Sequence, residues 1–258
     1  MIARAMWSLL AGALILGGTV RGADDNWELV WSDEFDGPEV SDEWVFETGN
    51  GNDGWGNNEL EFYQRENARI ADGMLIITAK KESRDGFNYT SARLKTQGRK
   101  SWKYGRIEAR IELPDFRGQW PAFWMLGDSI TEIGWPRCGE IDIMENINGD
   151  RRVHGTAHWS AEDGSKAEYG GGISTTITRF HVYAIEWDED FIRWFVDGRK
   201  YHEMRITDGV NGTSAFHEPF FIVLNLAVGG RWPGFDVENR KLPAEMRVDY
   251  VRVYQKKQ

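Results

Sequence analysis

The stretch that decides the fold is GEIDIMENIN, residues Gly139–Asn148. Side chains on a β-strand alternate between its two faces, so Glu140 and Asp142 share one face while the isoleucines beside them share the other. A strand of this kind belongs to a sheet that covers a core on one side and opens to a cleft on the other. The stretch therefore predicts a half-buried strand with an acidic open face.

The third acid of this stretch, Glu145, has the wrong parity for the acidic face. On a regular strand its side chain would point into the core. One extra residue, a β-bulge near Met144, would return it to the open face beside the other two acids. We therefore predict a bulge at this point.

Three carboxylates on one face suit the hydrolysis of glycosidic bonds. The retaining route needs two carboxyl groups about 5–5.5 Å apart, one as nucleophile and one as acid and base. A third acid between them can keep their ionisation states apart. On the spacing alone a solvated acidic strand is the better explanation, because 41 of the 258 residues are acidic. The neighbouring sequence has to decide between these interpretations.

The rest of the chain reads as short strands separated by Gly, Asn, Asp and Pro. The dipeptide Asp197-Gly198 lies between two of them and is a strong hairpin signal. Phe220–Val228 is the most apolar and is predicted to be the most buried. The other expected strands are Trp27–Trp31, Met74–Lys80, Arg106–Glu112, Val153–Ala157, Phe180–Trp187, Phe191–Val196, Lys200–Ile206 and Met246–Tyr254. This pattern predicts an all-β fold, a jelly-roll sandwich of two curved antiparallel sheets with a concave cleft.

The chain contains 13 Trp, several of them in segments that we expect to form the walls of a cleft. Flat aromatic rings stack on sugar faces while neighbouring polar groups bind the hydroxyls. The loop Gly49–Gln64 is rich in Gly and Asn around Trp55. In the strand Gln119–Gly127, Trp120 and Trp124 lie on one face. These features favour a polysaccharide ligand, with core packing as the alternative for any single Trp.

His158 follows a strand that we expect to pair with the acidic strand. This pairing would bring His158 near Glu145, where it could tune the acid, and a hydrogen-bonded structural histidine is the alternative. We find no His cluster with zinc spacing, no phosphate-binding Gly loop and no Ser-His-Asp set.

The N-terminal segment has the features of a signal peptide. Arg4 precedes the apolar run Ala5–Gly18, which is too short to span a membrane comfortably, and a cut is expected after Gly22 or Ala23. We expect residues 1–22 to be the signal peptide, residues 23–258 to form a single catalytic domain, and the protein to be secreted or periplasmic. We expect no membrane association after removal of the signal.

Removal of residues 1–22 takes away two arginines and no acids, so 31 basic residues become 29 against 41 acids, a net charge of −12. An acidic protein is a poor partner for nucleic acid, and we expect none. A neutral polysaccharide is compatible with this charge. The single Cys138 excludes an internal disulfide.

The acidic strand and its neighbours resemble glycoside hydrolase family 16, in its bacterial laminarinase branch. The signature is ExDxxE at Glu140–Glu145. The supporting blocks are GWGNNELE at Gly54–Glu61, YGRIEARI at Tyr104–Ile111, QWPAFWMLG at Gln119–Gly127, GWPRCGEIDIMENING at Gly134–Gly149, NLAVGGRWPG at Asn225–Gly234 and DYVRVYQ at Asp249–Gln255. The resemblance covers nearly the whole chain after the signal peptide.

This resemblance implies a β-jelly roll and retaining endo-hydrolysis of a β-1,3-glucan by a monomer. It implies Glu140 as nucleophile, Glu145 as general acid and base, and Asp142 as an assistant to the nucleophile. The substrate contacts that it implies are Trp120, Trp124, Trp135, Arg106, His158 and Asn58. It also implies a structural Ca²⁺ ion, away from the chemistry, held by Glu34, the Gly73 carbonyl and Asp249.

Two other functions stay open on the sequence. One is a β-glucan-recognition domain without catalysis, which the three retained acids disfavour. The other is hydrolysis of another chain, either mixed-linkage β-1,3-1,4-glucan or a galactan such as agarose or carrageenan. A sulfated galactan would call for a basic cleft, for which Arg106, Arg137 and Arg231 are the candidates.

Overall fold

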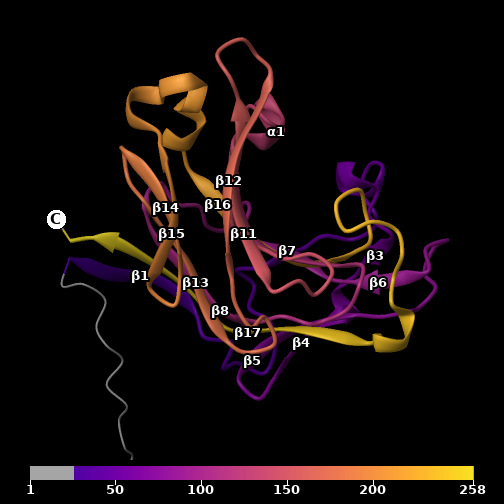
Figure 1. Ribbon diagram of the computed structural model, residues 1–258. Coiled ribbons are helices and arrows are strands. Elements are labelled where there is room, and N and C mark those ends of the chain that lie inside the picture. The colour runs from indigo at the N-terminus through magenta and orange to yellow at the C-terminus, as the bar shows by residue number, and fades with distance from the viewer. Residues whose placement is uncertain (1–25, 258) are drawn as a thin grey trace, which may run out of the picture.

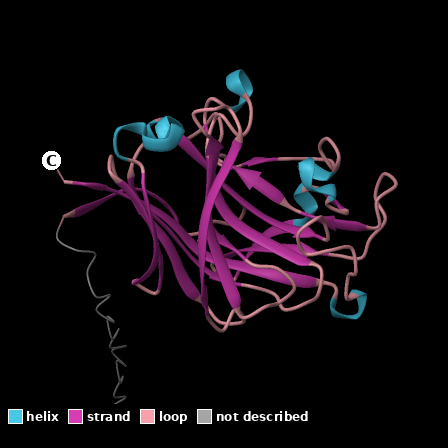
Figure 2. Cartoon of the chain, turned by 45° about the horizontal axis from the view of Figure 1, so that its top comes forward, coloured by secondary structure: helices cyan, strands magenta, loops and turns pink. Residues whose placement is uncertain are grey.

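Two antiparallel sheets stacked face to face form the protein in the computed structural model, which describes residues 26–257 (Figure 1). Figure 2 shows how little helix there is, all of it in short turns outside the two layers. The predicted all-β sandwich is therefore confirmed. The predicted signal peptide, residues 1–22, lies outside the described residues.

The first sheet has eight strands and forms the layer opposite the cleft. Its order is β15 (Arg199–Arg205), β14 (Phe191–Val196), β13 (His181–Trp187), β8 (Gly105–Glu112), β17 (Ala244–Lys256), β5 (Met74–Ala79) and β4 (Ala68–Ala71), with β1 (Trp27–Asp33) also paired to β17. In β8, the residues Ile107, Ala109 and Ile111 point into the core and are fully buried. The charged residues between them therefore face away from the second sheet.

The second sheet has seven strands and carries the site. Its order is β12 (Lys166–Ser174), β11 (Arg152–Ser160), β10 (Glu140–Glu145), β9 (Gln119–Gly127), β16 (Phe220–Val228), β7 (Arg93–Lys95) and β2 (Val45–Phe46). A parallel pair, β3 (Glu61–Tyr63) with β6 (Tyr89–Ser91), lies beside it. The helical segments are α1 (Ile130–Ile133) and turns at Gly54–Asn58, Arg65–Asn67, Thr207–His217 and Asn239–Lys241.

The hydrophobic core lies between the two sheets. Strand β16 is buried along its whole length, as its composition predicts. One face of β16 packs into the main core, and Phe221 and Val223 on its other face pack against Leu126 and Cys138. Burial of a large apolar side chain contributes about 1.5–3 kcal/mol, so this central strand anchors its neighbours β9 and β7 firmly.

The expected strands are all present, with ends that differ by at most a few residues. The predicted turn Asp197-Gly198 joins β14 to β15, and both residues have positive φ angles, 49° and 77°. Asp and Gly tolerate this left-handed conformation, which a tight two-residue hairpin requires. The hairpin prediction is confirmed.

Candidate active site

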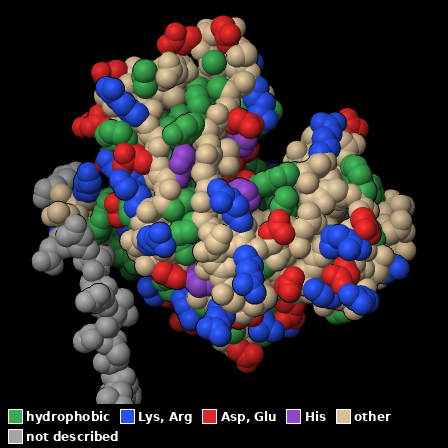
Figure 3. Space-filling model, in the orientation of Figure 1, with side chains coloured by type: hydrophobic (Ala, Val, Ile, Leu, Met, Phe, Trp, Pro, Cys, Tyr) green, Lys and Arg blue, Asp and Glu red, His purple; other side chains and the backbone are tan. Residues whose placement is uncertain are grey.

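A cleft of about 950 Å³ runs across the outer face of the second sheet. Its floor is formed by residues of β9, β10, β11, β12, β16 and β7, and loops from both ends of the sheet form its walls. Figure 3 shows the surface hollowed between two raised parts of the molecule. The predicted concave face is present, and a cleft of this size can hold several sugar units of a chain.

The three acids of β10 all line this cleft. The register explains why. Asp142 lies opposite Trp124 of β9 and Glu145 lies opposite Ala122, so three steps along β10 match two steps along β9. The same extra residue appears against β11. This is the predicted β-bulge, and it lets Ile143 and Met144 both enter the core while Glu145 returns to the cleft.

Crowding and burial raise the pKa values of all three carboxyl groups. Desolvation is the main cause for each of them. It raises the pKa of Glu140 to about 8, with a further contribution from the charge of Asp142. The pKa of Asp142 is also raised to about 8. The pKa of Glu145 is raised well above its ordinary range by burial and by the charge of Asp142. Three adjacent carboxylates cannot all be ionised here, so the site holds at least one proton near neutral pH.

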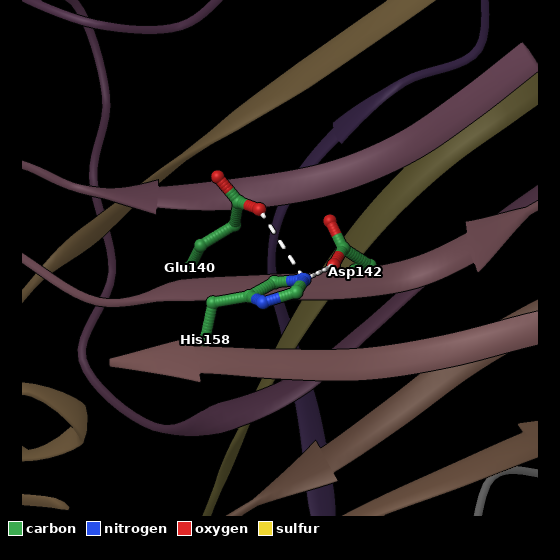
Figure 4. Close-up of side chains that lie close together, drawn as sticks. All are labelled: Glu140, Asp142 and His158. Carbon is green, nitrogen blue, oxygen red and sulfur yellow. Dashed lines mark ion pairs between the residues drawn. The ribbon is translucent and has the colours of Figure 1, made fainter. Parts of the chain in front are cut away.

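His158 lies on β11 directly opposite Glu140 (Figure 4). Its Nε2 atom is 3.2 Å from Asp142 Oδ2 and 3.7 Å from Glu140 Oε1. His158 lies near enough to Glu145 for its charge to lower the pKa of that acid, as expected, although the residue directly opposite Glu145 on β11 is His154. The donor atoms of Glu140, Asp142 and His158 lie within 4.8 Å of one another, an arrangement that could hold a metal ion.

Tryptophans flank the acids on the same face. Trp120 Nε1 donates a hydrogen bond to Glu145 Oε1 at 2.8 Å, and its ring meets Trp232 edge-to-face with centroids 5.5 Å apart. Trp124 Nε1 donates to Asn225 Oδ1 at 2.8 Å. Trp135 lies at the rim with 45% of its surface exposed. Acids among flat, partly exposed rings are the surroundings that a sugar chain needs.

The comparisons with known proteins agree with this geometry. Residues 56–252 match the model of the glycosyl hydrolases family 16. The chain belongs to this family. The laminarinase catalytic domain of Thermotoga maritima MSB8 superposes with a TM-score of 0.83 at 44% identity, covering 91% of this chain and all of that one. This family 16 chain therefore has the fold of a laminarinase.

Two further relatives differ in how much of them the chain covers. The Beta-glucanase of Rhodothermus marinus is 46% identical over 96% of this chain and 92% of that protein. The Clotting factor G alpha subunit of Tachypleus tridentatus is 53% identical over 90% of this chain. The chain spans only about a third of that protein, 34% of its length.

One of the predicted substrate contacts is wrong in this family 16 structure. Arg106 lies on β8 of the other sheet, and its guanidinium pairs with Glu108 and Glu186 on the outer surface. Alternation along β8 explains this, because the neighbouring Ile107 points into the core. Asn58 lies beside the cleft, and its contact with substrate stays a prediction. Its Oδ1 accepts a hydrogen bond from Arg231 Nε at 2.7 Å, and both Arg231 and the neighbouring Asn57 line the cleft.

The sequence did not reveal several cleft residues. The Arg93 guanidinium lies over the rings of Trp55 and Trp124, 4.5 and 4.9 Å from their centroids. Lys166 and Glu168 come from β12, where Glu168 lies opposite His158. Pairing of strands distant in the sequence creates these contacts. The sequence contains one local indication of the cleft position of Arg93: Arg93 and Lys95 are two residues apart in a short strand, so their side chains lie on the same face.

A buried polar network lies behind Trp124. Asn225 Nδ2 donates to the Tyr63 hydroxyl at 3.2 Å, and that hydroxyl donates to Glu59 Oε2 at 3.1 Å. Glu61 is fully buried and accepts a hydrogen bond from the Val228 N–H at 2.7 Å. Burial and the charge of Glu59 raise the pKa of Glu61 well above its ordinary range. This network fixes the loop that carries Trp55 to the floor of the cleft.

The three donors expected for Ca²⁺ come from one junction of the first sheet. Strand β17 pairs with β5 up to Val248 and with β1 from Val251, so Asp249 lies between the two ladders. Glu34 follows the end of β1, and Gly73 precedes β5. Oxygen donors of this kind suit Ca²⁺.

Each of the two carboxylates at this junction already meets an arginine. Arg252 donates to both oxygens of Glu34, at 2.9 and 2.8 Å, and Arg110 donates to Asp249 at 2.7 Å. The donor types suit the ion, but Ca²⁺ would have to displace these two ion pairs in order to bind.

Proposed function

We propose that the protein is a retaining endo-β-1,3-glucanase that hydrolyses internal bonds of laminarin-type glucans. The observation that carries this function is the bulged strand β10, which presents Glu140, Asp142 and Glu145 on the floor of one Trp-lined cleft. Membership of family 16 and the likeness to laminarinase structures support the choice of substrate. The open cleft suits a chain that lies across the sheet, and hence endo cleavage.

In the first step, the carboxylate of Glu140 attacks the anomeric carbon, and protonated Glu145 donates its proton to the departing oxygen. Glu145 is suited to hold that proton, because burial and the charge of Asp142 raise its pKa well above the ordinary range. Glu140 must be ionised. The nearby charges of His158, Arg93 and Lys166 each lower its pKa and oppose the effect of its burial.

In the second step, a water molecule attacks the glycosyl-enzyme ester and regenerates Glu140. Glu145, now ionised, accepts the proton of that water, so the β configuration is retained overall. Asp142 lies between the two glutamates along β10. We assign it the role of assisting the nucleophile, because whichever of Asp142 and Glu140 holds the proton, the other is more easily ionised.

Substitution of the two glutamates tests the assignment. Glu140→Gln and Glu145→Gln remove one catalytic group each with almost no change in volume, so turnover on laminarin should disappear while the thermal unfolding curve stays near that of the wild type. Azide should rescue a Glu140→Gly variant and give an α-glucosyl azide. Near-native turnover in either Gln variant, or a β-glucosyl azide, would contradict the roles.

The substrate range requires a direct comparison of polymers. We expect rapid loss of viscosity and laminari-oligosaccharide products from laminarin, with barley mixed-linkage β-glucan as the second candidate and agarose not cleaved. Laminarin bound tightly but never cleaved would identify a glucan-recognition domain. Cleavage of barley glucan in preference to laminarin would identify a mixed-linkage enzyme.

We further propose that Ca²⁺ binds at Glu34, the Gly73 carbonyl and Asp249, where it would tie three strands together. Ca²⁺ at 100 times its dissociation constant would stabilise the folded state by about 2.7 kcal/mol. We expect the wild-type Tm to rise with added Ca²⁺ and to stay unchanged in Glu34→Gln. An equal rise in the variant, or none in the wild type, would overturn this site.

Export as a monomer is part of the same proposal. It rests on the signal-like sequence at residues 1–22 and on a glucan substrate, a polymer too large to enter a cell. Among residues 26–257 we find no helix that is both long and apolar enough to cross a bilayer. Cell fractionation and gel filtration of the secreted protein test this: activity retained in the cytosol would contradict export, and a larger species would contradict the monomer.

A further inference from the structure

One carboxylate oxygen at the centre of the site has no hydrogen-bond partner. Asp142 is 3% exposed, and its Oδ2 atom is fully buried without a donor. The nearest polar atom is His158 Nε2 at 3.2 Å, in a contact that lacks the alignment of a hydrogen bond. Buried polar atoms in folded proteins nearly always have a partner, and an exception calls for an explanation such as an ion.

The two distances from His158 Nε2 to the acids are close to those between the ligands of one metal ion. Zinc binds His nitrogen and carboxylate oxygen at about 2.0–2.2 Å, so two ligands of a tetrahedral site lie about 3.3–3.5 Å apart. His158 Nε2 is 3.2 Å from Asp142 Oδ2 and 3.7 Å from Glu140 Oε1. Figure 4 shows the three side chains turned toward one another from two adjacent strands. Small side-chain rotations would complete the triangle.

The other ring nitrogen of His158 faces a further carboxylate. Glu168 on β12 places its Oε2 atom 3.6 Å from His158 Nδ1, and the β11–β12 ladder holds the two residues opposite each other. Nδ1 is buried without a hydrogen-bond partner, so the exposed Glu168 side chain has to move closer to bond the ring. Metal-binding histidines almost always direct their second nitrogen at such a carboxylate, which fixes the ring and strengthens the ligand. The arrangement leaves Nε2 directed at the two acids.

The surrounding charge also favours a cation. Glu145, Glu168 and Glu59 add three carboxylates to the two in the cluster, while the basic side chains of the cleft are Lys166, Arg93 and Arg231. A divalent ion would neutralise the repulsion among the acids. Nitrogen together with oxygen and a low coordination number suit zinc, whereas Ca²⁺ takes six to eight oxygen ligands.

We propose that Glu140, Asp142 and His158 form a binding site for Zn²⁺ or a similar divalent transition-metal ion, and that the bound ion reversibly blocks the cleft. Because all three residues line the cleft, water would supply the fourth ligand. An ion on Glu140 occupies the carboxylate that must attack the sugar, so metal and glucan exclude each other. Only this inhibitory effect depends on the proposed function; metal binding itself does not.

Calorimetric titration of the metal-free protein with ZnCl₂ tests the site directly. We expect one ion per chain for the wild type, loss of that binding in His158→Gln, and an affinity about 10–100-fold lower in Glu168→Gln. His181→Gln is the matched control, because His181 forms a histidine–carboxylate pair with Asp197 outside the cleft. Its affinity for zinc should equal that of the wild type. Absorption of Co²⁺ in the visible range should show tetrahedral coordination in the wild type and not in His158→Gln.

A second experiment tests whether bound zinc and glucan compete for the cleft. Zinc should inhibit laminarin hydrolysis competitively, and a laminari-oligosaccharide should raise the apparent dissociation constant of zinc. Unchanged zinc binding in both His158→Gln and Glu168→Gln, or its loss in His181→Gln, would overturn the site. Non-competitive inhibition would overturn the proposed block. The wild type could also bind zinc, lose that binding in His158→Gln, and yet never cleave laminarin. That result would support the metal site and refute the proposed hydrolase function.

Discussion

Substitution of Trp120 by Phe should change the protonation of Glu145, the proposed catalytic acid. Trp120 Nε1 donates to Glu145 Oε1 at 2.8 Å, and this contact lowers the pKa of Glu145 against the larger effect of burial. Phenylalanine keeps an apolar ring in the cleft and removes the donor. A hydrogen bond to a charged group contributes about 1.5–3 kcal/mol, against about 0.5–1.5 kcal/mol for a neutral one.

The difference between these values sets the size of the effect. The bond stabilises ionised Glu145 by about 1–1.5 kcal/mol more than protonated Glu145, and 1.36 kcal/mol corresponds to one pKa unit. Its loss should therefore raise the pKa of Glu145 by about one unit. Glycosylation needs Glu145 protonated, so the basic limb of the kcat/KM profile should move to higher pH by about one unit.

The assay is the pH profile of kcat/KM on a soluble laminari-oligosaccharide. Trp124→Phe is the matched control, since Trp124 lies on the same face of β9 and donates to Asn225 rather than to an acid. In this control we expect a higher KM, while the basic limb of the kcat/KM profile stays at the wild-type pH. A basic limb in Trp120→Phe that coincides with the wild type, or that moves to lower pH, would refute the role of this hydrogen bond.

Two further predictions concern the supporting structure. The folded-state pKa of Glu61 is raised above its ordinary value near 4.5, so above that pH the folded protein holds a proton that the unfolded chain releases. The unfolding free energy should therefore fall by up to about 1.4 kcal/mol per pH unit above that value. Glu61→Gln should show a flatter dependence of the unfolding free energy on pH between 4 and 8, and an unchanged slope would contradict the buried carboxyl. A Cβ atom on Gly155 would lie 2.3 Å from the Trp194 side chain, whose Nε1 donates to the Asp142 carbonyl. Gly155→Ala should therefore destabilise the fold by about 1–3 kcal/mol in denaturant unfolding and lower kcat. A wild-type unfolding free energy together with a wild-type kcat would show that this contact is relaxed at no cost.

Local parity explains why so much of the fold was predictable. The side chains of Phe220–Val228 left no solvent-facing side to the strand, and the structure buries all of it. Glu145 broke the alternation of its strand, and only a bulge could place it beside Glu140. In both cases a few adjacent residues contain the whole argument.

The same rule also exposes one wrong prediction. The alternation that directs Ile107 and Ala109 into the core already requires Arg106 to point outward on the same strand. The resemblance to a family placed this arginine in the cleft, and the parity of its own strand contradicted that placement. Local geometry should have taken precedence.

Contacts between distant segments could not be predicted. The ion pair of His158 with Asp142 depends on the β10–β11 register, which the bulge shifts by one residue. The placement of Arg93 over Trp55 joins a short strand to a loop about forty residues earlier in the chain. Sequence patterns report which face a side chain occupies, but not which neighbour it meets there.

The bulge in β10 also bears on which insertions and deletions this chain can tolerate. Deletion of one residue from a strand normally turns every later side chain to the opposite face. Between Asp142 and Glu145, β10 has one residue more than the facing segments of β9 and β11. Deletion of Ile143 would therefore leave a regular ladder on each side, with the three acids at alternate positions and still on the cleft face. A six-residue and a five-residue strand can thus carry the same set of acids. A change of length at this point could spread through descendants of one gene without passing through an inactive form.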